Sequence, residues 1–141
     1  MRGALAIALV AVAFVVVVGC GRSDYGADVS FDDVTDTIAL AGLAVCSTET
    51  TETLPPGAVE EKVYAVDPDC ADDDGRALVV ATAYEGEDDR DAAAQRFEVQ
   101  ARPPASGAVW TFGPFTVRVG GDRDPDTIDA LTEALDQRAA R

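Results

Sequence analysis

The chain of 141 residues contains no histidine, and its only lysine is Lys62. Without histidine it lacks the commonest general base, the commonest metal ligand and every Ser-His or Cys-His nucleophile pair. Positive charge is also scarce, because 11 Lys and Arg face 26 Asp and Glu and the net charge is −15. Such a surface repels nucleic acid and anionic lipid headgroups. These shortages argue against a nucleic-acid partner and against catalysis, and we expect neither a cofactor nor a metal.

The one long apolar run lies at the amino terminus and ends in a cysteine. Arg2 precedes it, residues 4–18 carry no charged or polar side chain, and Gly19 and Cys20 follow. A short basic start, an apolar stretch and small residues at its end are typical of a secretory signal. The sequence therefore predicts an exported protein.

The end of this run, Val17-Val18-Gly19-Cys20, matches a lipobox, with an aliphatic residue three positions before the cysteine and glycine directly before it. In this feature the chain resembles a bacterial lipoprotein precursor. The resemblance implies removal of residues 1–19, a lipid thioether on Cys20, often acylation (palmitate) of the new amino terminus, and a place on the outer face of the cell membrane. Two or more acyl chains would hold the protein stably there.

Two other interpretations of the amino terminus remain open. The uncharged stretch 3–21 is close to the roughly 20 residues that span a bilayer, so an uncleaved anchor is one alternative. The other is an ordinary signal peptide, for which Val17 and Gly19 would be the small residues at the cleavage site.

Downstream of the signal we expect a flexible tether at residues 20–29 and one extracytoplasmic domain at residues 30–141. Removal of Arg2 with the signal changes the net charge to −16. The remaining chain has the length of a single domain with a modest core.

Hydrophobic periodicity and turn residues predict an α+β fold, a small antiparallel sheet with helices packed on it, in the order α-β-β-β-α-β-β-α. The predicted helices are 30–42, 87–100 and 124–139, with Ser30 and Asp124 as caps of the first and the last, and Gly42 as the residue that ends the first. The predicted strands are 43–46, 62–66, 77–84, 108–112 and 115–119. Residues 47–57 are rich in Thr and Glu and show no apolar period, and they are predicted to be a loop or an extended edge. The strand 77–84 is almost wholly apolar, which favours a central position.

Gly113-Pro114 predicts a tight hairpin turn, because glycine tolerates a positive φ at the first central position. The resulting register collects the large apolar side chains on one face: Trp110, Phe112, Phe115, Val117 and Val119. The last helix carries an apolar stripe of Ile128, Leu131, Leu135 and Ala139. We expect this helix to cover the hairpin, with Trp110 or Phe112 touching Leu131 or Leu135. The alternative is that Trp110, Phe112 and Phe115 form an exposed binding platform.

Three cysteines divide into the lipid-bearing Cys20 and a pair, Cys46 and Cys70. Outside the cytoplasm disulfides persist, so a Cys46–Cys70 bridge is predicted, with two free buried thiols as the alternative.

The acidic stretch 67–75 invites a calcium interpretation. Placing Gly75 at position 6 of an EF-hand loop puts Cys70 at position 1 and Ala81 at position 12, where acidic residues are required. A solvated acidic turn fits better. The second acidic cluster, at 85–91, is explained by the start of a helix, with Asp88 or Asp89 as its cap. Phe97, Ala93 and Ala94 are expected on the buried side of this helix.

Several short motifs support a second resemblance: Gly42-Leu43 with Cys46 after the first helix, Asp89 to Ala93 at the start of the next, and Gly113-Pro114 beside a tryptophan. Together they resemble small uncharacterised lipoproteins of actinobacteria. That resemblance implies a fold and a cell-envelope location, and it implies no activity.

The function expected from the sequence is therefore a membrane-anchored cell-envelope lipoprotein that acts as a non-catalytic interaction or binding module, with an envelope protein as partner. It could also modulate a neighbouring envelope complex. The alternative from another class is a carboxylate-dependent envelope enzyme such as a glycan hydrolase.

Overall fold

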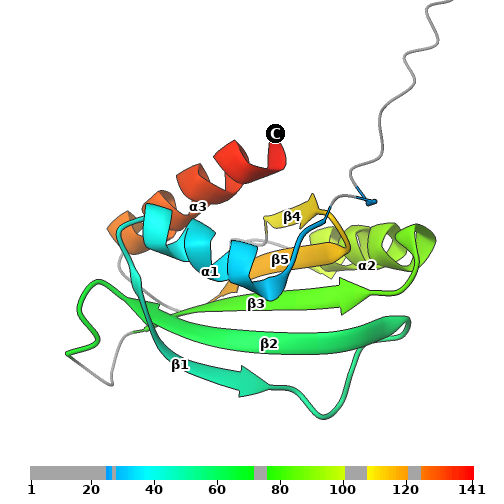
Figure 1. Ribbon diagram of the computed structural model, residues 1–141, viewed down its shortest axis with the longest axis horizontal. Coiled ribbons are helices and arrows are strands. Elements are labelled where there is room, and N and C mark those ends of the chain that lie inside the picture. The colour runs from blue at the N-terminus through cyan, green and yellow to red at the C-terminus, as the bar shows by residue number, and fades with distance from the viewer. Residues whose placement is uncertain (1–24, 27, 72–75, 101–107, 121–124) are drawn as a thin grey trace, which may run out of the picture.

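The structure, a computed structural model, describes residues 25–26, 28–71, 76–100, 108–120 and 125–141. Within them the elements follow the predicted order (Figure 1): α1 (Phe31–Leu40), β1 (Ala44–Thr50), β2 (Ala58–Asp67), β3 (Ala77–Tyr84), α2 (Glu87–Gln100), β4 (Val109–Phe112), β5 (Phe115–Gly120) and α3 (Pro125–Ala139). The signal sequence and Cys20 lie outside the described residues, so their assignment stays a prediction.

All five strands form one antiparallel sheet in the order β1-β2-β3-β5-β4. The apolar strand β3 lies in the middle, as its composition predicts. The hairpin register is also as predicted, with Phe112 opposite Phe115 and Trp110 opposite Val117. Gly113 at the turn has φ 52°, the left-handed region that glycine adopts without strain.

The two faces of the sheet have different characters. Alternate residues of β2, β3 and β5 point to a face covered by α1 and α3, and these apolar side chains form the core: Tyr64, Val66, Ala77, Val79, Ala81, Phe115, Val117 and Val119. The opposite face is covered at one end by α2, which packs on β3, β4 and β5 (Figure 1). Its buried side chains are mostly polar.

Helix α1 begins as its sequence predicts. Ser30 is the N-cap, its backbone N–H donates to the Asp33 carboxylate at 2.8 Å, and the Asp33 N–H donates to the Ser30 carbonyl at 3.1 Å. This reciprocal pair satisfies backbone donors that have no partner inside the helix. Beyond the end of the helix, Gly42 has φ 77°, the left-handed conformation that stops a helix.

Helix α3 lies against the apolar side of the hairpin, as predicted. Leu131 and Leu135 share one buried cluster with Trp110 and Phe112, and the indole Nε1 of Trp110 donates to Asp136 Oδ1 at 2.7 Å. The aromatic side chains of the hairpin are therefore core, and the binding-platform alternative is wrong.

The two ends of α3 differ from the rest of the helix in how they compare with the prediction. Ala139, expected in its apolar stripe, is exposed, because the last turn of the helix extends past the sheet. The predicted cap Asp124 lies outside the described residues.

Strands β1 and β2 are longer than predicted. Residues 47–50, predicted to be a loop or an extended edge, belong to β1, and residues 48–50 pair with Tyr64, Val63 and Lys62. The extended-edge alternative is therefore confirmed for residues 47–50, because β1 is an edge strand exposed on both faces. Backbone hydrogen bonds to β2 hold the strand in place. Because neither face of β1 is buried, its sequence has no alternation of apolar and polar residues that would reveal a strand.

The end of the predicted tether contacts the domain. The Tyr25 hydroxyl donates to the Tyr84 carbonyl at 3.0 Å, and Val29 packs against the core. The Cβ of Val29 lies 2.6 Å from where a side-chain carbon on Gly113 would stand, so the tip of the hairpin fits directly under it.

Candidate functional site

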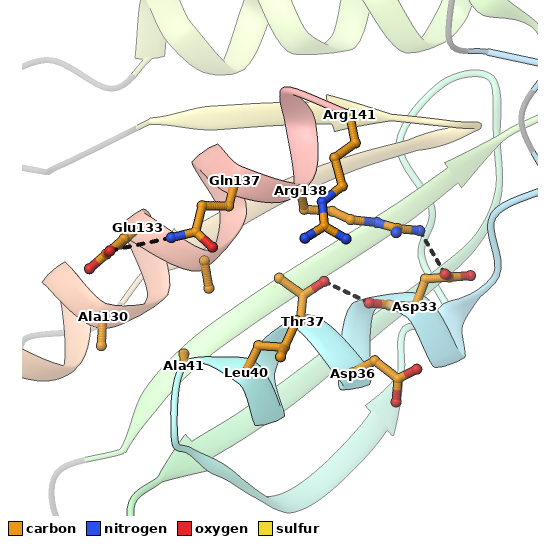
Figure 2. Close-up of a pocket in the computed structure, with 11 residues that line it drawn as sticks. Asp33, Asp36, Thr37, Leu40, Ala41, Ala130, Glu133, Gln137, Arg138 and Arg141 are labelled. Carbon is orange, nitrogen blue, oxygen red and sulfur yellow. Dashed lines mark hydrogen bonds and ion pairs between the residues drawn. The ribbon is translucent and has the colours of Figure 1, made fainter.

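A groove of about 410 Å³ lies between α1 and α3, the two helices that cover the core. Its lining is mixed: Asp33, Asp36, Thr37, Leu40, Ala41, Ala130, Glu133, Ala134, Gln137, Arg138 and Arg141. Figure 2 shows that α1 supplies one wall and α3 the other.

One end of the groove is an ion pair between the two helices. Arg138 Nη2 lies 2.6 Å from Asp33 Oδ1, and Arg141 extends from the end of α3 toward α1 beside it (Figure 2). The backbone N–H of Ser30 is the main group that lowers the pKa of Asp33; burial opposes this, and the Ser30 hydroxyl and Arg138 lower it further. Asp33 therefore stays ionised and fixes the spacing of the helices at this end.

Away from this ion pair the lining includes small and apolar side chains. Ala130 and Ala134 come from α3, and Leu40 and Ala41 lie at the end of α1. Leu40 is 79% exposed, the most exposed large apolar side chain among the described residues. The exposure of a leucine side chain to water is unfavourable, and in this position the side chain contributes little packing inside its own domain.

Two further carboxylates line this groove. Asp36 and Glu133 are exposed, and Glu133 Oε1 accepts from Gln137 Nε2 at 3.3 Å (Figure 2). Apolar surface next to exposed negative charge is a pattern suited to a partner with the opposite charge.

A second group of polar side chains lies on the other face of the sheet, beneath α2. Glu61 of β2 is 7% exposed and accepts from the Thr82 hydroxyl of β3 at 2.7 Å. Arg118 of β5 lies 3.4 Å from the same carboxylate, and its guanidinium stacks on the Phe97 ring with 3.9 Å to the centroid. Phe97, expected to be buried, is half-buried because it covers this arginine.

Tyr84 and Thr116 complete this group. Both are buried, and neither hydroxyl has a hydrogen-bond partner in the described part of the chain; the same holds for Arg118 Nε. Burial raises the pKa of Tyr84 above its ordinary value, and the nearby Thr116 and Arg118 side chains offset this only in part. The Thr116 hydroxyl thus lies near that of Tyr84 without reaching hydrogen-bond geometry.

Helix α2 is held by an arginine that sequence reasoning missed. Arg90 is buried, its Nη1 donates to the Gly113 carbonyl at 2.6 Å, and its Nη2 lies 2.8 Å from Asp91 Oδ1. The pattern of acidic residues around it predicts an exposed helix start, so only the tertiary contact with the hairpin turn identifies its role. Asp88 and Asp89, proposed as caps, instead lie in the first turn.

The predicted disulfide is confirmed. Cys46 of β1 and Cys70, in the turn after β2, are joined with an S–S distance of 2.02 Å. Near it, Asp67 and Asp69 accept backbone N–H groups of Cys70 and Ala71 at 3.1 and 3.0 Å.

The acidic turn is described only in part. Residues 72–75 lie outside the described ranges, so the predicted solvated turn is not tested there. In the ranges that are described, no three acidic or cysteine side chains are placed to hold a metal ion together.

Comparison with family models, with curated proteins and with solved structures finds no match. Within the described ranges, each helix is too short or too polar to cross a bilayer.

Proposed function

We propose that this protein is a cell-envelope lipoprotein that acts as a membrane-anchored interaction module, and that the groove between α1 and α3 is its docking site. The observation that carries the docking site is Leu40, the last residue of α1, which is exposed in a groove whose lining also includes three alanines. The anchor rests on the lipobox that ends at Cys20.

The disulfide supports the proposed location. A Cys46–Cys70 bridge persists in an oxidising compartment and is uncommon in cytosolic proteins. An exported domain is what a signal sequence with a lipobox would deliver. Both features therefore agree with a domain displayed on the outer face of the membrane.

The proposed occupant is a short segment of an envelope protein that carries an apolar side chain flanked by basic ones. The apolar side chain would lie against Leu40 and the alanines, in the way that helical segments use grooves between helices. The basic side chains would lie near Asp36 and Glu133. The net charge of −15 also favours a basic partner at long range.

The enzyme alternative finds less support in this groove. A hydrolase that uses two carboxylates needs one of them protonated, with a raised pKa. Asp33 has its pKa lowered and is paired with Arg138. A modulator of a neighbouring envelope complex is a special case of the same docking proposal.

The test is chemical crosslinking in membranes, followed by recovery of the protein with its partner. We expect wild type to recover one partner repeatedly, and Leu40→Asp to lose it because a charge replaces the apolar contact. Glu133→Lys should also weaken recovery, and its difference from wild type should shrink at high salt, because salt screens the exposed charges.

A matched control is Val99→Asp, which changes another exposed apolar side chain, on α2 and away from the groove. It should leave recovery unchanged. If Leu40→Asp and Val99→Asp both recover the partner as well as wild type, the groove is not the docking site.

A further inference from the structure

The face of the sheet beneath α2 is polar, whereas a helix usually packs on an apolar sheet face. Glu61, Thr82, Thr116 and Tyr84 are all buried there, on three adjacent strands. Only Glu61 and Thr82 make a short hydrogen bond with each other. The composition of this face is therefore not explained by packing.

Three polar atoms of this face lack a partner within the described chain: Tyr84 Oη, Thr116 Oγ1 and Arg118 Nε. Buried polar groups in folded proteins are nearly always hydrogen-bonded, and where protein groups do not serve, an internal water or a ligand does. The three side chains point to the same side of the sheet, and Tyr84 is close enough to Thr116 and Arg118 for both to influence its titration.

Helix α2 covers this face lightly. Its buried residues are Arg90 and Ala93, both in its first half, and Arg90 fixes that half to the hairpin turn. Toward the other end, Phe97 stacks on Arg118 and Val99 is exposed. A helix end with so little apolar burial opens at low cost, which gives a small molecule a route to the polar atoms.

The charges of this face are already matched, because the Glu61 carboxylate lies 3.4 Å from the Arg118 guanidinium. A charged ligand would leave one of the two uncompensated, so an uncharged ligand is favoured. We propose that Tyr84, Thr116 and Arg118 form a binding site for an uncharged hydroxyl group, supplied by water or by a small polyol. Such a group donates and accepts hydrogen bonds at once, as two hydroxyls and an N–H require. This inference is independent of the groove between α1 and α3.

The first test compares the urea midpoints of Thr116→Val and Tyr84→Phe with wild type. If these hydroxyls hold a ligand, each variant removes a hydrogen bond and the midpoint falls. If the hydroxyls have no partner, each variant removes a buried unpaired group and the midpoint rises, which overturns the proposal. Thr48→Val, on the exposed strand β1, controls for the preference of valine for strands.

A second test identifies the ligand by NMR of the wild-type domain, and it serves even where a variant fails to fold. Contacts from a long-lived water to residues 82–84 and 116–118 would assign the site to water. Saturable shifts of the same signals during a glycerol titration would assign it to a polyol, and Thr116→Val should abolish them. Absence of both signals would overturn the proposal, and lowered midpoints would then reflect a direct Tyr84–Thr116 bond.

Discussion

Trp110 illustrates how one side chain ties a helix to a hairpin in this protein. Its ring is 8% exposed and belongs to the main core, while its N–H reaches a carboxylate of α3 at the surface. Both the apolar contact and the hydrogen bond depend on the register that Gly113-Pro114 sets.

We expect Trp110→Ala to lower the free energy of unfolding by about 3–5 kcal/mol, the range for truncating a buried aromatic residue. Trp110→Phe keeps most of the ring and loses the bond to Asp136, so it should cost about 1 kcal/mol. Urea denaturation of the isolated domain measures both, and Val59→Ala, at a 55% exposed position, should be nearly neutral. A wild-type midpoint for Trp110→Ala would contradict the core assignment.

Asp33 should make stability depend on pH. Its folded pKa lies below its value in the unfolded chain, mainly because the Ser30 N–H stabilises the carboxylate. The stabilisation is thus present above the unfolded pKa, near 4, and is lost as the pH falls through the folded pKa.

We therefore expect Asp33→Asn to destabilise the domain at pH 7 by roughly 0.5–1 kcal/mol, the usual range for a charged side chain at a helix start. The difference from wild type should shrink below about pH 4 and vanish once wild-type Asp33 is protonated. Asp32→Asn, an exposed neighbour in the same turn, controls for the general effect of charge near the helix dipole. Equal pH dependence in the two variants would show that the capping bond contributes nothing of its own.

At the residue scale, the sequence predicts those side chains whose role follows from local pattern. Ser30, Gly42 and the hairpin aromatics belong to this group, because capping, helix termination and register act over a few residues. Arg90 and Tyr84 could not be found in this way. The Gly113 carbonyl that binds Arg90, and the Thr116 and Arg118 side chains near Tyr84, lie more than twenty positions away in the chain. No local pattern marks a buried arginine.

At the scale of elements, the disulfide joins the edge strand β1 to the turn after β2. An edge strand has hydrogen-bond partners on one side only, and β1 buries little of its own surface. The bridge therefore acts where the sheet is held most weakly.

Replacing Cys46 and Cys70 together by serine should lower the free energy of unfolding by roughly 3 kcal/mol in the chain-entropy description. Hydrogen exchange should rise in β1 before it rises in β3, because β1 loses its covalent attachment. Non-reducing peptide mass spectrometry of exported protein should show the Cys46–Cys70 link. Unmodified thiols at both positions in that sample would contradict the bridge.

The boundaries of elements were predictable where the sequence marks them locally. Strand β3 and helix α2 have the predicted bounds, since one is almost wholly apolar and the other lies between clear turn residues. The first strand was predicted too short because it is defined by its pairing with β2 and not by a buried face. Sheet order also lies beyond local pattern, because β5 rather than β4 pairs with β3.

At the scale of the whole molecule, the proposed anchor makes a direct prediction. Cys20→Ala should release the protein from the membrane or leave it as the uncleaved precursor, because no thiol would remain for the lipid. The intact mass of the wild-type membrane form should correspond to an acylated chain that begins at residue 20. A wild-type membrane form that still carries Met1 would refute lipidation and favour an uncleaved anchor.

The contacts of Tyr25 and Val29 limit how far the domain can stand from such an anchor. Because the Tyr25 hydroxyl donates to the Tyr84 carbonyl at the end of β3, Cys20 lies only five positions along the chain from a residue that contacts the domain. Fully extended, five residues reach at most about 17 Å. A lipid on Cys20 would therefore keep Tyr25, and with it the end of β3, close to the headgroups, and a partner would have to approach from within the layer next to the membrane.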